Sequence, residues 1–161
     1  MDPQAVIEVF RRNLTEHYFD LKGRVGRREF WTFVLASFLV LLAAAIVDGI
    51  LHTGLLGPVI GLALLLPLTG LGARRLQDIG RDGQLVWLWT LACVVTQVLA
   101  LLTFMSGPYG ALYFLYTMGW LIGLINLAAL VISVVLIYFW AQPGTAGPNQ
   151  FGPDPKGAAT P

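Results

Sequence analysis

Long apolar segments separated by short polar ones dominate the sequence. Four of them are long enough to cross a bilayer, because about 17–25 mostly apolar residues span the hydrocarbon core as a helix. They cover residues 31–47, 55–73, 85–105 and 118–140. The pattern therefore predicts an all-α fold, a four-helix transmembrane bundle within residues 31–140. The last apolar stretch begins earlier, at Ala111, so residues 111–117 are either a helical extension or a segment lying in the outer interface.

The segments on either side of the bundle carry different signals. In residues 1–30, Asp2 followed by Pro3 resembles a helix N-cap with proline at the first helical position, and apolar residues then recur every four positions from Val6 to Tyr18. This spacing predicts a short amphipathic helix on the membrane surface. Residues 141–161 form a tail in which Pro143 to Pro155 holds four prolines and three glycines, so it should form an ordered turn or a loose tail.

Basic residues predict the orientation of the spans, since short cytoplasmic loops accumulate Lys and Arg and exported ones do not. The N-terminal segment, the loop between the second and third spans, and the tail carry all ten: Arg11, Arg12, Lys22, Arg24, Arg27 and Arg28; Arg74, Arg75 and Arg81; Lys156. The other two loops carry none. Four spans place every basic residue on one side of the membrane, so both termini should be cytoplasmic.

Composition also indicates a membrane protein rather than a soluble or nucleic-acid-binding one. Hydrophobic residues make up 57% and charged residues 12% of the chain, against about 45–50% and about 25% in soluble domains. From Gly83 to Pro153 there is no Lys, Arg, Asp, Glu or His. The net charge of +1 gives no case for a nucleic-acid partner. Cys93 is the single cysteine, which excludes an intramolecular disulfide and suits a small buried hydrophobe.

Three polar boxes flank the predicted spans on the predicted cytoplasmic side. They are residues 23–31 before the first span, residues 74–83 between the second and third, and residues 143–155 after the fourth. The candidate binding or latch residues all lie in these boxes: Arg24, Arg27, Arg28, Glu29, Arg74, Arg75, Asp78, Arg81, Asn149 and Asp154. Because the boxes leave the membrane at one level, we expect them to form one surface.

In order and position, these boxes resemble the motifs of a bacterial inner-membrane family known as domain of unknown function 805. The resemblance covers roughly residues 15 to 155 and rests on Tyr18 to Arg24, Arg27 to Trp31, Arg74 to Leu76, Asp78, Gly80, Arg81, Gly83 and the fixed positions from Pro143 to Pro155. The chain departs from the family pattern at Gln77, Asp82, Gln84 and Gln150, where the family usually has His, Ser, Trp and Arg. The resemblance implies an inner-membrane location and a four-span architecture, and it supplies no activity.

The middle box admits two interpretations. Its glycines permit close backbone approach and its three arginines could donate hydrogen bonds to a phosphate. The alternative is a positive-inside anchor, in which Asp78 and Asp82 neutralise neighbours within a tight loop. We favour the anchor over the phosphate cradle, because cytoplasmic loops carry arginine for topology whatever their function.

Polar residues inside the spans suggest packing contacts. Gln97 and Asn126 lie at similar depths, about 18–21 Å from the cytoplasmic boundary at 1.5 Å per residue, so we expect an intramembrane polar pair. Asp48 and His52 are four residues apart at the outer end of the first span, where a solvated pair is favoured over a proton or cation site. Two Gly-x-x-x-Gly patterns, at 57–61 and 119–123, suggest close helix packing.

No enzyme signature, metal cluster or cofactor motif stands out, and we expect neither metal nor cofactor. The leading hypothesis is a non-enzymatic envelope protein whose cytoplasmic face binds a partner or anionic lipid. The alternative is a small oligomeric transporter or channel subunit, although no ionisable residue lies deep within a span. Membrane lipids are the expected partners, with a homo-oligomer or a membrane protein partner left open.

Overall fold

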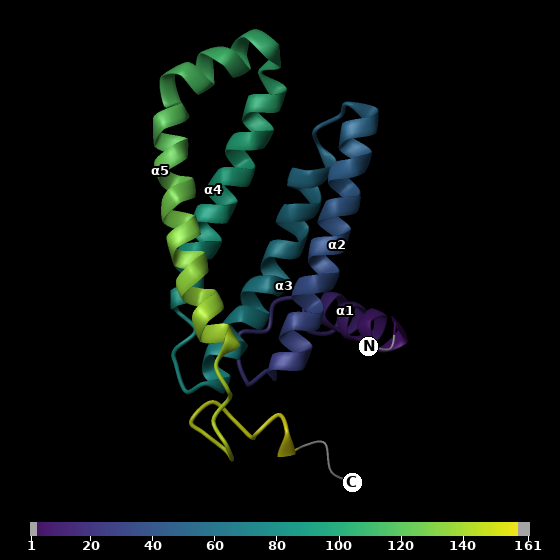
Figure 1. Cartoon of the computed structure of the whole chain (residues 1–161), viewed down its shortest axis with the longest axis vertical. Coiled ribbons are helices and arrows are strands. Elements are labelled where there is room, and N and C mark those ends of the chain that lie inside the picture. The colour runs from purple at the N-terminus through teal and green to yellow at the C-terminus, as the bar shows by residue number, and fades with distance from the viewer. Residues whose placement is uncertain (1–2, 158–161) are drawn as a thin grey trace.

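The computed structural model describes residues 3–157 and is all-helical across them, as the apolar pattern predicts. Five helices follow one another along the chain (Figure 1): α1 Pro3–Thr15, α2 Arg27–Leu51, α3 Leu56–Asp78, α4 Leu85–Met105 and α5 Gly107–Ala141. The last four are long and apolar enough to cross a membrane. The predicted N-cap Asp2 and the last four residues of the tail lie outside the described residues.

Helix boundaries agree with the apolar pattern at some ends and extend past it at others. α4 has the predicted bounds, and residues 111–117 are helical because α5 begins at Gly107. In Figure 1 the first turns of α5 cross over from the end of α4 before the helix runs back alongside it. The placement of Arg74 and Arg75 in a loop is wrong, since both lie in the last turns of α3. Their charges are compatible with a buried helix because protein groups bind them, as described below.

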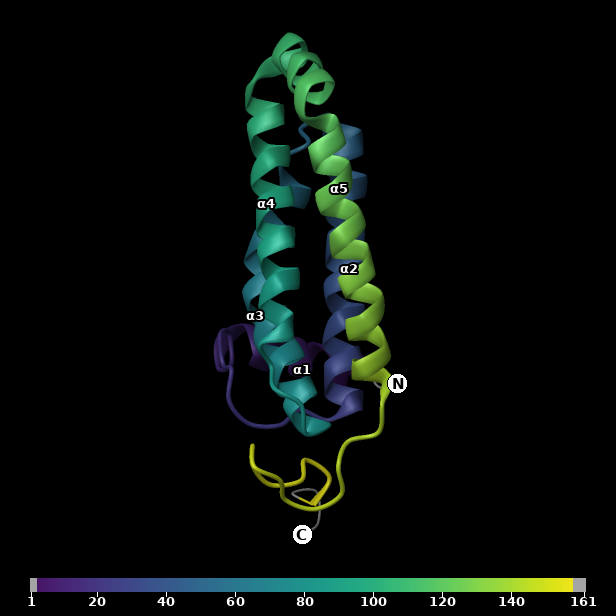
Figure 2. The same ribbon diagram turned by 90° about the vertical axis from the view of Figure 1, so that its left-hand side faces the viewer.

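The four long helices form two hairpins. α2 packs on α3 and α4 packs on α5, while α3 also contacts α4 and joins the hairpins. Figure 1 shows the hairpins close together where α3 ends and diverging toward the other end, and Figure 2 shows the elongated outline. α1 packs against α2 at the converging end. We call this end, where α2 and α4 begin and α3 and α5 finish, the basic end.

The buried core lies at the basic end. Its largest apolar members are Phe30, Phe33, Leu71, Leu76, Leu136 and Trp140. α3 is the central helix, since 44% of its most apolar 18 residues are buried, against 11% in α2 and α4 and 6% in α5. The large exposed apolar side chains along the other three helices are those expected to face lipid.

The turn between α2 and α3 is closed by Asp48. Its carboxylate accepts hydrogen bonds from the backbone N–H of Leu55 and Leu56, both at 3.1 Å, and of Gly57 at 2.7 Å, and from the Thr53 hydroxyl. These are the N–H groups that the first turn of α3 leaves unpaired. His52 instead places Nδ1 2.7 Å from the carbonyl of Gly49. Asp48 therefore caps α3 and does not share a site with His52.

Candidate functional site

The three polar boxes meet at Asp78, the last residue of α3. Asp78 Oδ1 accepts a hydrogen bond from Arg24 Nε at 3.0 Å, and Oδ2 accepts one from Arg75 Nη1. All three side chains are buried, with exposed fractions of 5% for Asp78, 1% for Arg24 and 0% for Arg75. A buried carboxylate between two guanidinium groups is compatible with folding because every charge has an opposite partner.

Both arginines also bind backbone carbonyls at the end of α5 or just beyond it. Arg24 donates to the carbonyl oxygens of Thr145 and Gly147, each at 2.6 Å. Arg75 donates to the carbonyl of Trp140 at 2.9 Å and to that of Gln142. The last carbonyls of a helix have no partner within it, and cationic side chains satisfy them. We call Asp78, Arg24, Arg75 and these four carbonyls the Asp78 network.

The third box folds back onto α3 as an ordered turn. The Thr145 N–H donates to the Asp78 carbonyl at 2.9 Å, and Asn149 Nδ2 donates to the Gln77 carbonyl at 3.0 Å. Gly144 is needed where it stands, since a Cβ there would collide with the Asp78 carboxylate. Of the two alternatives for this segment, the structure shows the ordered turn rather than a loose tail.

Asp154 holds the turn of the third box together. It accepts hydrogen bonds from the backbone N–H of Lys156 at 2.9 Å and of Gly147 at 3.1 Å. These two bonds, with the nearby positive charge of Arg24, lower the pKa of Asp154 from its ordinary value. Asp154 therefore acts within the tail and makes no ion pair with the other described boxes.

A second polar cluster fastens α1 to the start of α2. Glu29 Oε1 accepts from Arg12 Nη2 at 2.6 Å and from Asn13 Nδ2 at 3.3 Å. Asn13 Oδ1 in turn accepts from Arg74 Nη2 at 3.3 Å, and Arg74 is only 6% exposed. Sequence reasoning missed Asn13, although a polar residue on the apolar face that contains Phe10 was a usable signal. Glu29 and Arg74 therefore hold α1 against α2 and α3 through Arg12 and Asn13.

Three candidate arginines remain at the surface. Arg27 and Arg28 at the start of α2, and Arg81 after α3, are exposed. Across residues 3–157 none of them takes part in an ion pair. The Arg81 guanidinium carbon lies 4.1 Å from the centre of the Phe139 ring, a cation–π contact. The ten candidate residues thus divide into buried or turn-forming groups and an exposed set of three.

The glycines of the middle box serve the backbone. Gly80 has a φ of 77° and ends α3, with its N–H bound to the Gln77 carbonyl and the Arg81 N–H bound to the Leu76 carbonyl. This is the Schellman pattern of helix termination. Gly83 lies so close to α3 that a Cβ would be 2.8 Å from Ala73 Cβ. With Arg74 and Arg75 also bound to protein groups, the phosphate cradle retains only one of its three arginines.

The predicted pairing of Gln97 with Asn126 is wrong. Asn126 Nδ2 donates to the carbonyl of Ile122 in its own helix at 2.9 Å. The Gln97 amide lies against Gly61 of α3, where a Cβ would collide with it. Interhelical polar contacts lie elsewhere: the Thr69 and Thr90 hydroxyls are 2.8 Å apart, and Trp89 Nε1 donates to Ser133 Oγ at 2.9 Å. An amide can be satisfied by the carbonyl four residues back, so equal depth does not require a partner.

Gly61 and the second glycine pair behave differently. Gly61 admits a side chain from the neighbouring helix, as a small residue in a membrane helix does. Gly119 and Gly123 on α5 have nothing within 4 Å of a Cβ position. Within the described chain, only the first of the two predicted packing patterns is used.

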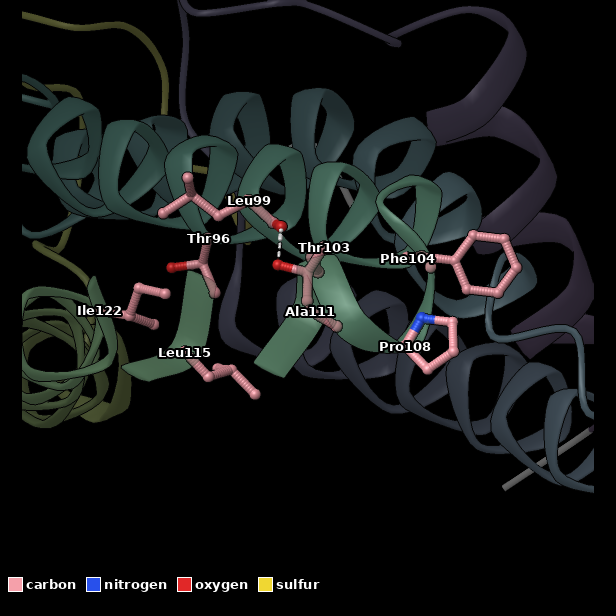
Figure 3. A pocket seen from close by; sticks show the side chains of 10 residues that line it. Thr96, Leu99, Thr103, Phe104, Pro108, Ala111, Leu115 and Ile122 are labelled. Carbon is pink, nitrogen blue, oxygen red and sulfur yellow. Dashed lines mark hydrogen bonds between the residues drawn. The ribbon is translucent and has the colours of Figure 1, made fainter. Parts of the chain in front are cut away.

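An apolar cavity of about 590 Å³ lies at the opposite end, between α4 and the first turns of α5. Figure 3 shows Leu99, Leu115 and Ile122 among its lining side chains. The Thr103 hydroxyl donates to the Leu99 carbonyl at 2.7 Å, the bond drawn in Figure 3. Its lining contains no titratable side chain, and the described residues contain no group of three potential metal ligands.

Comparison with known proteins places the chain in a family. The family model described as "Protein of unknown function (DUF805)" matches residues 18–153. Two proteins of Escherichia coli strain K12 are similar over most of their length. "Inner membrane protein YhaH" is 28% identical over 147 residues, covering 88% of this chain and 91% of that protein. "Inner membrane protein YhaI" is 30% identical over 149 residues, covering 89% and 92%.

A third relative from the same strain, "Uncharacterized protein YiiR", is 30% identical over 142 residues, covering 84% of this chain and 86% of that protein. No solved structure matches. The family match spans all three boxes that meet at Asp78 except the last two residues of the third. Together with four helices of membrane-spanning length, these findings show that the chain belongs to the DUF805 family and is a multi-pass inner-membrane protein.

Proposed function

We propose that this protein is a non-enzymatic inner-membrane protein whose basic end faces the cytoplasm and binds anionic phospholipid headgroups through Arg27 and Arg28. The observation that carries the proposal is the division of the arginines. Arg24, Arg74 and Arg75 are buried and bound to protein groups, whereas Arg27 and Arg28 are exposed and adjacent. Two exposed guanidinium groups in the first turn of one helix, without an ion-pair partner in the described chain, favour an anionic surface.

Their position favours a lipid over a soluble anion. Arg27 and Arg28 occupy the first turn of α2, four and three residues before Trp31, and aromatic rings of this kind favour the headgroup level of a membrane. A cavity of about 270 Å³ between α1 and α2 is lined by the apolar side chains of Val6 and Val9, by Arg28 and by Glu29, whose carboxylate is already paired with Arg12. A guanidinium beside an apolar recess fits a phosphate with an attached acyl chain.

Orientation is part of the proposal. The ten basic residues predict that the basic end is cytoplasmic, because exported short loops lack Lys and Arg. Reporter fusions after Asp82 and at Pro161 should both report the cytoplasm, and a fusion at Gly110 should report the exported side. An exported Pro161 would contradict the four-span arrangement and with it the cytoplasmic lipid site.

The binding test uses the purified full chain in mild detergent, titrated with phosphatidylglycerol or phosphatidylcholine of matched chains and followed by native mass spectrometry. In the variant R27Q/R28Q, the number of phosphatidylglycerol adducts should decrease by about two- to five-fold per charge removed, the range of an exposed ion pair. The variant R11Q removes an exposed arginine already paired with Glu8 at 2.9 Å, so it should bind as the unaltered chain does.

Other results would replace the proposal. Equal phosphatidylglycerol binding by R27Q/R28Q and the unaltered chain would reduce the two arginines to topological anchors. A stoichiometric protein that co-purifies with the unaltered chain and is lost from R27Q/R28Q would indicate a protein partner at this surface.

A further inference from the structure

A second polar cavity opens at the basic end, beside the first turn of α4. Its volume is about 860 Å³, and Arg81, Asp82, Trp87 and Leu88 are among the residues that line it. The opening thus contains one cation and one anion. In the described chain these two side chains form no ion pair with each other or with any other residue.

Each charge is held by a different part of the protein. The Arg81 guanidinium carbon lies 4.1 Å from the centre of the Phe139 ring near the end of α5. The Asp82 Oδ1 atom accepts a hydrogen bond from the Gln84 N–H at 3.2 Å, at the start of α4. The exposed Trp87 ring lies at the same opening, 5.9 Å from the Phe19 ring. The opening therefore presents two separated opposite charges beside an aromatic ring.

A cavity in the membrane-spanning part of the molecule adjoins this opening at Leu88. This aliphatic cavity, of about 310 Å³, lies between α4 and α5 and shares Leu88 with the polar opening. Its lining is entirely aliphatic and includes Leu91 and Ala92 of α4 and Ile125 and Ala128 of α5. The two cavities together change from charged to aliphatic along the axis of α4, the same change of polarity found along a phospholipid.

We propose that the two cavities bind one phospholipid with a zwitterionic, primary-amine headgroup, of the phosphatidylethanolamine type. Its phosphate meets Arg81, its ammonium group meets Asp82, and one acyl chain lies between α4 and α5. Arginine suits the phosphate because its planar fork donates two hydrogen bonds. Asp82 disfavours a headgroup that brings only negative charge, and a quaternary ammonium has no N–H to donate to it. The site is separate from Arg27 and Arg28 and does not depend on them.

The test measures headgroup preference in the full-length protein. The protein in mild detergent is titrated with phosphatidylethanolamine, phosphatidylglycerol and phosphatidylcholine of identical acyl chains, and adducts are counted by native mass spectrometry. The variant D82N should lower the ratio of ethanolamine to glycerol adducts by about two- to five-fold, the range of one exposed charge pair. The variant R81Q should lower binding of all three lipids. E16Q, which removes an exposed acid in the segment after α1, should leave the ratio unchanged.

A third variant tests the aliphatic cavity, and a second background separates this site from the anionic one. A128W places a large side chain between α4 and α5, so it should lower binding of all three lipids without changing their ratio. Repeating D82N in the R27Q/R28Q background should give the same change in ratio. An unchanged ratio in D82N overturns the proposal, whether or not Arg27 and Arg28 bind lipid. A change of oligomeric mass in A128W, with lipid adducts retained, also overturns it by showing that a second copy fills the cavity.

Discussion

The two ends of the molecule are built from the same four long apolar helices but are held together to very different degrees. At the basic end Phe30 and Leu71 are fully buried and the Asp78 network joins three segments. At the opposite end, by contrast, Met105 is 77% exposed and both Tyr109 and Tyr116 are 89% exposed. Lipid tails are as apolar as leucine, so apolarity inserts a helix without attaching it to its neighbours. Close packing and polar contacts attach helices, and this chain concentrates both at one end.

The polar contacts at the basic end join boxes that are far apart in the sequence. Arg24 and Asp78 are separated by 54 residues, and Arg24 and Thr145 by 121. Through Arg24 and Arg75, the Asp78 carboxylate therefore connects the segment before α2, the end of α3 and the segment after α5. The opposite end has no comparable connection among the described residues, and its helices diverge (Figure 1).

The largest effect should come from removing the charge of Asp78. In D78N the two guanidinium groups of Arg24 and Arg75 stay buried without a counter-charge, which costs about 3–5 kcal/mol. Thermal unfolding in detergent should show a large decrease in the midpoint. E16Q, which removes an exposed acid, should unfold as the unaltered chain does. Similar midpoints for D78N and E16Q would show that the Asp78 network does not stabilise the basic end.

A pair of leucines compares the two ends directly. Leu71 of α3 is 0% exposed, whereas Leu102, near the end of α4, is 54% exposed. L71A leaves a cavity in the core and should lower the free energy of unfolding by about 2–5 kcal/mol. L102A removes a lipid-facing side chain and should change it by no more than about 0.5 kcal/mol. Equal losses in the two variants would contradict the idea that packing is confined to the basic end.

The sequence was sufficient to predict the fold because long apolar segments and helix-breaking glycines are local signals. It predicted five helical segments, the bounds of α4 and the helical character of residues 111–117 as one of two alternatives. It misplaced Arg74 and Arg75 because a charged residue next to an apolar span normally marks its end. Only the tertiary structure shows that Asn13 and the Asp78 carboxylate make a buried helical position acceptable for them.

The sequence indicated most of the side chains of the site but not the bonds between them. Arg24, Asp78 and Asn149 were singled out, and the expectation that the boxes share one surface agrees with their contacts. The carbonyl groups of Trp140 and Gln142 were missed, since every residue has a carbonyl and sequence cannot rank them. The pairing of Gln97 with Asn126 failed because depth along a helix says nothing about the direction in which a side chain leaves it.

A smaller effect should distinguish polar side chains that are hydrogen-bonded between spans from those that only lie at the same depth. Q97L and N126L are not in contact, so their effects on the free energy of unfolding should add within about 0.3–0.5 kcal/mol. Thr69 and Thr90 share a hydrogen bond at 2.8 Å, so T69V and T90V should show a coupling of about 0.6 kcal/mol. The measurement is a double-variant cycle of thermal unfolding in one detergent. A coupling energy between Gln97 and Asn126 as large as that of the threonine pair would show that the two side chains are in contact, contrary to the structure.

The smallest effect concerns the third box and depends on pH. Hydrogen bonds from Lys156 and Gly147 hold the pKa of Asp154 below its ordinary value in the folded chain. A lowered folded-state pKa means that the stabilisation is present at neutral pH and is lost as pH falls below about 4, through the folded pKa. Exchange protection of the Gly147 amide, corrected for intrinsic rates, should therefore decrease over this range. D154N should show the lower protection already at pH 7 and little further change on acidification. If D154N retained the full pH dependence, a different group would control the turn.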